Sequence, residues 1–349
     1  MTAERMVNMA IDFKMLNDAP RLLMEAELKP VQGDRFQPTG FPDLGAARYT
    51  LHDGTEMLLV ESPQSVANRM ELACWDDETD DLINALIGLP YILVKIPGGK
   101  KLTTSILESH RINSPYILEG TDKRVFDLLK VGAAGMEIGP VKISDLAKLV
   151  FRYDANAVLH GVFLAKKELA GGRLRMTRLL TGFIEARNIK VAESGGVKND
   201  RVDPAGDTKS GFGNVPFARS EFTAEEIKAY FNLDLAQLRG YGLDDSATNL
   251  LITLALFKVH RFLSAGLRLR TACDLEVADG LKVTRPGGFS IPSETDLLQE
   301  CSNLIATCKS EGLFAESNIT EVVWTKKKES ASVDLPQGTP EPTIPEQDE

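Results

Sequence analysis

The chain has 349 residues, of which 43% are hydrophobic and 26% are charged. A chain of this length and composition buries one large core or two modest ones, which excludes a wholly disordered protein. The first twenty residues contain Glu4, Arg5 and Asp12, so they lack the apolar stretch of a signal peptide. The most apolar later run, Leu250 to Phe257, is far shorter than the ~20 residues that span a bilayer. We therefore expect a cytoplasmic protein without a membrane partner.

The net charge of -10 is unevenly distributed. Six acidic residues and no basic residue lie between Glu329 and Glu349, and five more acids lie between Asp76 and Asp81. The segment from Gly161 to Arg219 instead holds eleven Lys and Arg residues against six Asp and Glu residues. A basic segment inside an acidic chain is compatible with an RNA groove, although such a bias more often marks a solvated face.

Cysteine and histidine usage argues against a metal site. The chain has four cysteines (Cys74, Cys273, Cys301 and Cys308), which form no CxxC pair and no zinc-type cluster with histidine. We expect them to be reduced, buried thiols. The four histidines are widely spread, and His160 and His260 are expected to be core residues. No metal and no cofactor are predicted.

Three early strands are expected where apolar residues alternate or run continuously. They are Arg21 to Leu28, Met57 to Val60 and Tyr91 to Ile96. Gly33 to Gly45 is predicted to be an irregular loop, because it contains two prolines and three glycines. Ser62 and Pro63 are typical of the N-cap and first turn of a helix, which we expect to run through Trp75.

The middle of the chain is expected to contain a strand over Val158 to Ala165. The helical spacing of apolar residues from Met176 predicts a helix up to Arg187, with Arg175 and Arg178 on its more exposed face. A short strand over Lys190 to Glu193 is followed by a Gly-, Pro- and Asp-rich loop from Ser194 to Asn214. A loop of this length usually binds something or is disordered.

The C-terminal part is predicted to begin with a strongly apolar helix, capped by Asp245 or Ser246, that ends at Gly266. Alternation predicts one strand over Leu267 to Val277, and Ser293 to Lys309 is expected to form an amphipathic helix. The acidic tail beyond Lys328 is expected to be disordered. Strands interleaved with helices predict an α+β or α/β core.

The common catalytic motifs are incomplete or absent in this sequence. Pro97 to Lys101 lacks the first glycine and the Ser or Thr of a P-loop, and no Gly-x-Ser-x-Gly elbow occurs. The acidic pair Asp244 and Asp245 precedes a helix, where carboxylates cap free N–H groups. We therefore expect a protein that is not an enzyme.

Three loops combine basic, amide and aromatic side chains, a mixture that suits single-stranded RNA. The predicted contacts are Arg35, Phe36, Gln37, Thr39 and Phe41 in the first loop, Ser62, Gln64, Asn68 and Arg69 at a helix start, and Lys198, Arg201, Lys209, Phe212 and Arg219 in the third. Each loop alone is more often structural than functional. The hypothesis of RNA binding depends on the three together.

Five strings lie in or near these loops. They are Arg35 to Gly45 (RFQPTGFPDLG), Glu61 to Arg69 (ESPQSVANR), Ser109 to Ile117 (SHRINSPYI), Ser194 to Val202 (SGGVKNDRV) and Asp207 to Arg219 (DTKSGFGNVPFAR). In this order they resemble the RAMP-superfamily backbone subunit of the type I-G (formerly I-U) CRISPR Cascade effector complex. The likeness runs from about Arg21 to Val277, and its third string adds His110 and Arg111 to the predicted RNA contacts.

The resemblance implies an α+β, RRM-like (ferredoxin-fold) palm over residues 21–323. An N-terminal extension (1–20) would precede it, a disordered acidic tail (324–349) would follow, and residues 194–219 would form an inserted thumb. Several copies would polymerise along CRISPR guide RNA in a helical filament, joined by other Cascade subunits, and present the guide to target DNA in antiviral defence. The aromatic pair of ordinary RRMs is not evident, so RNA contact is expected through backbone and loops.

Two alternatives remain open. Related subunits of type III complexes are similar in fold and cut target RNA with a loop aspartate, for which Asp200, Asp203 and Asp207 are the candidates here. The other alternative is a scaffold that binds only proteins. Binding of single-stranded RNA that weakens steeply with salt would separate the main hypothesis from this scaffold.

Overall fold

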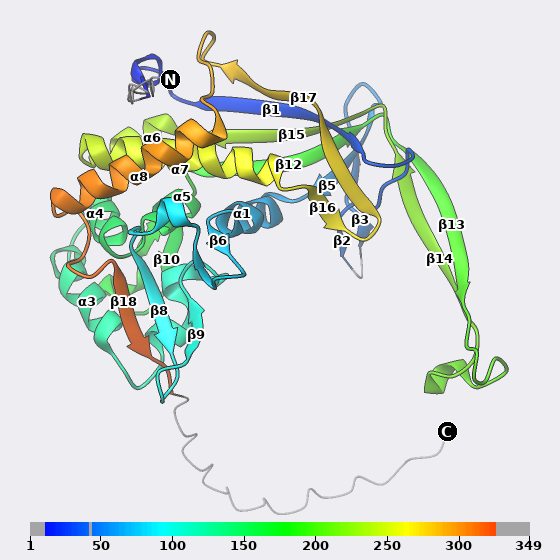
Figure 1. Cartoon of the computed structure of the whole chain (residues 1–349), viewed down its shortest axis with the longest axis horizontal. Coiled ribbons are helices and arrows are strands. Elements are labelled where there is room, and N and C mark those ends of the chain that lie inside the picture. The colour runs from blue at the N-terminus through cyan, green and yellow to red at the C-terminus, as the bar shows by residue number, and fades with distance from the viewer. Residues whose placement is uncertain (1–10, 42–43, 326–349) are drawn as a thin grey trace, which may run out of the picture.

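The computed structural model describes residues 11–41 and 44–325, and its largest element is a seven-stranded antiparallel sheet (Figure 1). The strand order is β16-β17-β1-β15-β12-β5-β4. The strands are β1 (Leu22–Pro30), β4 (Arg48–Thr50), β5 (Glu56–Glu61), β12 (Leu180–Arg187), β15 (Glu226–Leu233), β16 (Leu267–Arg270) and β17 (Cys273–Arg285). The predicted mixed α+β class is confirmed.

Six elements of this layer follow one another as strand, helix, strand, strand, helix, strand. They are β1, α1 (Pro63–Leu72), β12, β15, α7 (Asp245–Ser264) and β17. The four strands lie in the order β17-β1-β15-β12, and each pair of neighbours is antiparallel. Helix α1 packs on β12, and α7 packs on β15 and β17, so both helices cover one face of the sheet (Figure 1).

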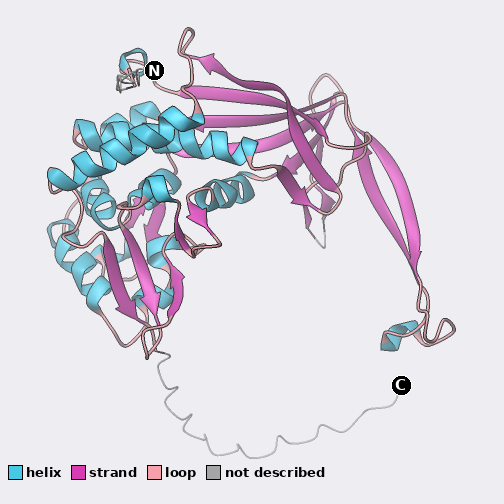
Figure 2. Ribbon diagram, in the orientation of Figure 1, coloured by secondary structure: helices cyan, strands magenta, loops and turns pink. Residues whose placement is uncertain are grey.

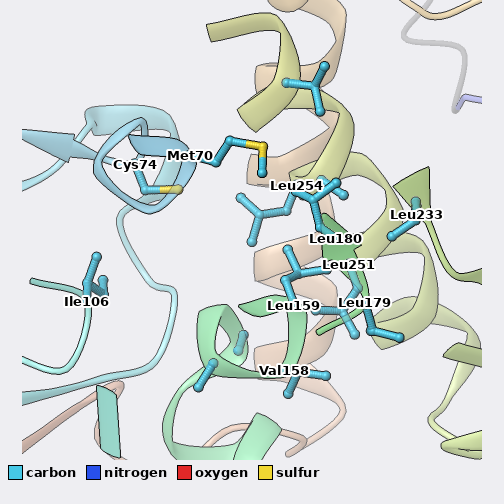
Figure 3. Packing of buried hydrophobic residues seen from close by; sticks show 14 of the residues in the cluster. Met70, Cys74, Ile106, Val158, Leu159, Leu179, Leu180, Leu233, Leu251 and Leu254 are labelled. Carbon is cyan, nitrogen blue, oxygen red and sulfur yellow. The ribbon is translucent and has the colours of Figure 1, made fainter. Parts of the chain in front are cut away.

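The core lies between this sheet face and the two helices. The inward residues of β1 are Leu22, Met24, Ala26 and Leu28, all buried, as the alternating pattern predicts. Helix α7 is apolar nearly all round because it is covered on nearly all sides. Figure 3 shows Met70 of α1, Leu180 of β12 and Leu254 of α7 gathered in this core.

A large insertion, residues 73–179, lies between α1 and β12 and forms a second body of helices and short sheets (Figure 2). Its helices are α2 (Pro115–Leu118), α3 (Arg124–Ala133), α4 (Ile143–Tyr153) and α5 (Ala155–His160). Its strands are β6 (Trp75–Asp76), β7 (Asp81–Leu82), β8 (Tyr91–Lys95), β9 (Lys101–Thr104), β10 (Val162–Leu164) and β11 (Leu174–Met176). The C-terminal strand β18 (Ile319–Val323) pairs in parallel with β8, which closes the insertion onto the rest of the chain.

The remaining elements are short or peripheral. They are β2 (Gly40–Phe41), β3 (Gly45–Ala46), α6 (Leu235–Gly240), α8 (Glu294–Ser310) and the hairpin strands β13 (Lys190–Lys198) and β14 (Val215–Thr223). The hairpin leaves the sheet between β12 and β15 and projects away from the body, with residues 199–214 at its far end (Figure 1). Helix α8 packs along α7, and its buried Cys301 and Cys308 lie on that side.

Several sequence-based predictions of local structure are confirmed. Strands occur at the three early positions, and Ser62 caps α1 by accepting the Ser65 N–H at 3.3 Å. Helix α1 ends at Leu72 rather than at Trp75. Helix α8 begins after its N-cap Ser293, and all four cysteines are buried and free.

Five predictions are wrong. The helix expected up to Arg187 is strand β12, whose inward residues alternate, and the single strand over Leu267 to Val277 is two strands that turn after Arg270. The first half of the strand expected at Val158 to Ala165 is helix α5, which ends because Gly161 adopts a positive φ of 79°. The loop expected from Ser194 is strand as far as Lys198, and Asp244 rather than Asp245 or Ser246 is the N-cap residue of α7.

The N-terminal extension is described from residue 11 only, and it contains a single turn of 3₁₀ helix at Lys14–Leu16. The acidic tail lies outside the described residues from position 326 onward. None of the described helices combines the length and the apolar character that a membrane crossing requires.

Candidate nucleic-acid interface

The first turn of α1 lies between two surface pockets. Glu61, just before this turn, holds the neighbouring side chains in place by hydrogen bonds. This carboxylate is almost fully buried and accepts hydrogen bonds from Ser65 Oγ and from the guanidinium of Arg270, with Arg69 Nε at 3.5 Å. Arg69 also donates to the Leu269 carbonyl at 2.7 Å. Two arginines from different segments are therefore fixed beside the helix start, although a buried carboxylate neutralises much of their charge.

One pocket, which we call the loop pocket, lies between the 33–47 loop and the base of the hairpin. It has a volume of about 540 Å³ and is lined by Gln37, Pro38, Thr39, Gly40, Gly45, Ala46, Ser220, Phe222 and Arg270. Arg270 donates to the Gln37 carbonyl at 2.9 Å, and Gln37 N–H donates to the Ala272 carbonyl at 2.7 Å. The loop is thus held against the turn between β16 and β17.

The other pocket, which we call the arginine pocket, lies between α1 and the insertion and has a volume of about 540 Å³. Gln64 of α1, His110, Phe163 of β10, Arg175 of β11 and Arg178 are among its lining residues. Arg178 donates to Gln64 Oε1, which ties the pocket to α1. The Arg175 guanidinium lies 5.8 Å from the centroid of the Phe163 ring.

A buried polar network forms the floor of the arginine pocket. Arg111 makes a two-point ion pair with Glu71 of α1, and its Nη1 donates to the Gly161 carbonyl at 3.2 Å. Lys258 Nζ lies 2.9 Å from His160 Nε2 and also donates to Asn156 Oδ1. An ammonium can only donate, so His160 Nε2 is the acceptor and its ring proton is on Nδ1.

Burial and the neighbouring charges shift the pKa values of His160 and Arg178. Burial, then Lys258, Arg111 and Arg178, hold the pKa of His160 well below its usual value, which keeps the imidazole neutral. Burial and the nearby Arg111 also lower the pKa of Arg178. Positive charge is therefore concentrated at this pocket and is only partly balanced by Glu71.

The outer part of the hairpin carries cations without carboxylate partners. Lys198, Arg201 and Lys209 are exposed, and none forms an ion pair with another described residue. Two exposed rings, Phe212 and Phe217, accompany them. Exposed cations beside exposed rings can contact phosphates and stack on bases.

The base of the hairpin is different because Glu221 neutralises its arginines. Arg35 Nη1 lies 3.3 Å and Arg219 Nη1 lies 4.0 Å from this largely buried carboxylate, which also accepts from Ser194 Oγ. The Arg219 guanidinium lies 5.7 Å from the Phe217 ring centroid. Arg35 and Arg219 thus lie at the surface, but Glu221 partly neutralises their positive charge.

Two of the three candidate nuclease aspartates, Asp200 and Asp207, stabilise turns at the end of the hairpin. Asp200 accepts the N–H groups of Val202, Asp203 and Gly213 at 2.8, 3.1 and 2.9 Å. Asp207 accepts from Lys209 N–H at 3.1 Å and from Ser210 Oγ at 2.7 Å. These hydrogen bonds lower the pKa of both carboxyls, as expected for side chains that stabilise turns.

Two predicted RNA contacts need correction. The ring of Phe36 is 1% exposed, and its backbone pairs with Phe222, so it packs in the core and cannot stack on a base. Arg111 is buried, and its guanidinium is engaged in the ion pair with Glu71, so its role is structural rather than direct contact with RNA. The side chain of Phe41 lies outside what the structure describes.

The other predicted contacts divide among the three surfaces. Gln37 and Thr39 line the loop pocket, and Gln64 and His110 line the arginine pocket. Asn68 is exposed on α1, where it accepts from Gln64 Nε2 at 3.0 Å, and Ser62 serves as N-cap. The sequence-based set missed Phe163, Arg175 and Arg178. The two arginines were expected on an exposed face, but of a helix that does not form.

Residues 22–191 match the model of a family described as CRISPR-associated protein GSU0053 (Cas_GSU0053). The matched segment contains β1, α1, the insertion and β12, and ends at the start of the hairpin. It is just under half of the chain. The match supports the coarser part of the sequence resemblance, that to a CRISPR-associated protein.

Comparison with solved structures finds low similarity. A chain titled "CRISPR RNA-guided surveillance complex, pre-nicking" is 14% identical, with a TM-score of 0.39 over 83% of this chain and 87% of that chain. Csc2 of Thermofilum pendens is 10% identical, with a TM-score of 0.30 over 87% of this chain and 81% of that chain. TM-scores this low do not establish a shared fold. No curated protein matches the chain.

Proposed function

We propose that this protein is a non-catalytic, RNA-binding backbone subunit of a type I-G CRISPR effector complex. In this proposal the central layer is an RRM-like palm, several copies assemble along the guide RNA, and other Cascade subunits complete the complex. The guide held in this way would pair with target DNA in the cytoplasm. The match of residues 22–191 to a CRISPR-associated family supports the setting, and the βαββαβ order of the central layer supports the palm.

The proposal of RNA binding depends on a set of cations, on two projecting parts of the protein, that have no carboxylate partner among residues 11–41 and 44–325. Lys198, Arg201 and Lys209 lie on the hairpin, and Arg175 and Arg178 lie on the insertion. In Figure 1 the hairpin and the insertion project to the same side of the sheet, with α1 between them. A single strand crossing this side of the molecule would meet cations at both ends.

The chemistry of these groups favours holding RNA without reading its sequence. Lysine and arginine contact phosphates, and exposed rings stack on any base. Gln64 in the first turn of α1 and Asn68 one turn later present amide groups, which suit sugar and phosphate oxygens. A guide whose sequence changes from one spacer to the next requires this kind of contact. We propose no cleavage. The carboxylates of Asp200 and Asp207, two of the three candidate aspartates, are occupied as turn caps, which supports this part of the proposal.

The test is fluorescence anisotropy with two labelled 30-nucleotide single strands of unrelated sequence and with a duplex control. We expect the two single strands to bind within about twofold of each other, with affinity that falls steeply between 50 and 200 mM salt. Electron microscopy of the protein with guide-length RNA should show copies at regular intervals. Absence of binding at 50 mM salt would favour a protein-only scaffold, and shortening of the RNA in wild-type protein but not in Asp200→Ala would favour a nuclease.

A further inference from the structure

The arginine pocket contains positive charge that the described part of the protein does not neutralise. Arg111 is paired with Glu71, but Arg175 and Arg178 have no carboxylate within ion-pair distance among the described residues. Among the described residues, the Arg178 guanidinium is held by Gln64, and burial together with the nearby Arg111 lowers its pKa. An anion placed between these guanidinium groups would relieve that repulsion.

An exposed aromatic ring borders the same charge. Phe163 is 49% exposed, although Val162 and Leu164 on either side of it are buried. It is paired across the ribbon with Arg175, whose guanidinium lies over the ring at 5.8 Å from the centroid. A half-exposed ring with a cation on one face is the arrangement on which an unpaired base stacks.

The pocket is also lined by polar side chains that can form hydrogen bonds with a sugar and a phosphate. His110 is exposed at its rim, Asn113 lies on the adjoining 3₁₀ turn, and Gln64 reaches in from α1. The volume of about 540 Å³ is within the range of small-ligand sites. The pocket is therefore large enough for one nucleotide with its phosphate.

We propose that the arginine pocket binds one unpaired nucleotide of a single-stranded RNA, with its base stacked on Phe163 and its phosphate against Arg178 and His110. This inference rests on the proposed function and adds a defined contact to it. Arg111, which is 7% exposed, is a positioning residue here, because its ion pair with Glu71 holds the pocket floor in place.

Photo-crosslinking tests the position of the base directly. An oligoribonucleotide with 4-thiouridine at every position is bound to the full chain, irradiated and digested with trypsin. We expect a crosslinked peptide covering residues 153–166, which contains His160 and Phe163. Crosslinks confined to the hairpin and α1 in a chain that binds RNA would overturn the pocket and leave the proposed function standing. A wild-type chain that fails to bind RNA would overturn both.

Two variants separate stacking from charge. Phe163→Ser should weaken binding of the oligoribonucleotide about tenfold without changing the salt dependence, because a stacked base carries no charge of its own. Arg178→Gln should weaken binding and reduce the slope of log K against log salt by about one. Arg152→Gln, an exposed arginine on α4, is the matched control and should leave both quantities unchanged. Wild-type affinity in both pocket variants would refute the proposal.

Discussion

Glu71 of α1 and Arg111 of the insertion form a buried two-point ion pair, with Oε1 to Nε at 2.6 Å and Oε2 to Nη2 at 2.7 Å. It joins the central layer to the inserted body at a position where Arg111 has a positive φ of 51°. A left-handed backbone conformation is uncommon for arginine, so the surrounding contacts must stabilise it. The pair therefore fixes a strained backbone as well as two charges.

Replacing Glu71 by Ala should strongly destabilise the protein. The variant leaves the Arg111 guanidinium buried without a partner, which costs about 3–5 kcal/mol. Urea denaturation measures this loss in the free energy of unfolding. Asp145→Ala is the control, since it removes the exposed ion pair with Lys142 and should cost less than about 1 kcal/mol. Equal losses in the two variants would show that the buried pair has no special role.

Gly161→Ala should be destabilising by about 2–4 kcal/mol. Gly161 has φ 79° and ψ 157°, and a Cβ there would lie 2.8 Å from the Met176 carbonyl oxygen and 3.0 Å from Arg178 N. These atoms belong to the backbone of one neighbouring segment, which cannot move aside as a flexible side chain could. Gly135→Ala is the control, because it has an ordinary φ and no atom within 4 Å of the added methyl. Thermal unfolding should show a clear drop in Tm for the first variant only.

Asp154→Asn should change how stability depends on pH. Burial raises the pKa of Asp154 from 3.8 to about 6, so between these values the folded state binds more protons than the unfolded state. Stability from this group is present below about pH 4 and is lost as pH rises through about 6. The total loss is about 3 kcal/mol, from about two pKa units.

The difference between variant and wild type isolates this effect, because His160 and the other titrating groups contribute to both proteins. Asparagine can still accept the Ala157 N–H that Asp154 now accepts at 2.9 Å. Urea titrations at several pH values should show the variant gaining relative stability from about pH 4 to about pH 7 and a constant difference above. A difference that is flat with pH would mean that the carboxyl titrates normally.

Replacing Lys198, Arg201 and Lys209 together by Gln should weaken RNA binding without affecting folding. Three phosphate contacts on a single strand correspond to a decrease of about two in the salt slope. Their exposure predicts an unchanged Tm. The charge-matched control replaces Lys142, Lys148 and Arg152 of α4 by Gln. An equal effect of the two triple variants would indicate a nonspecific effect of net charge.

Local sequence patterns predicted the elements that are exposed on one side and buried on the other. Strand β1 and helix α8 have polar and apolar faces, so their periodicity is visible in the sequence. The pattern failed at β12, where Leu180, Ile184 and neighbouring apolar residues fit helical spacing as well as alternation. Hydrogen bonding to β15 and β5 on either side decides the conformation there, and local sequence does not contain that information.

The candidate site was predictable only where a residue's own loop determines its exposure. Lys198 and Gln64 are exposed as expected. Phe36 is buried instead, because its backbone pairs with that of Phe222, which is almost two hundred residues later in the sequence. Phe163 was missed because its exposure depends on a two-stranded ribbon whose strands are separated by a turn. The arginine pocket is formed by α1 together with the insertion, and long-range contacts of this kind leave no short motif.

The projecting hairpin enters and leaves the sheet at neighbouring strands, after Arg187 of β12 and before Glu226 of β15, which face each other in register. A tight turn could therefore connect these two positions without disturbing the pairing behind them. The base of the arm is bonded to the body through Ile189 and Phe222, but the part beyond this base makes none of the hydrogen bonds of the layer, so its length can change while those bonds stay the same. Spacing along a bound strand could thus be altered independently of the folding of the core.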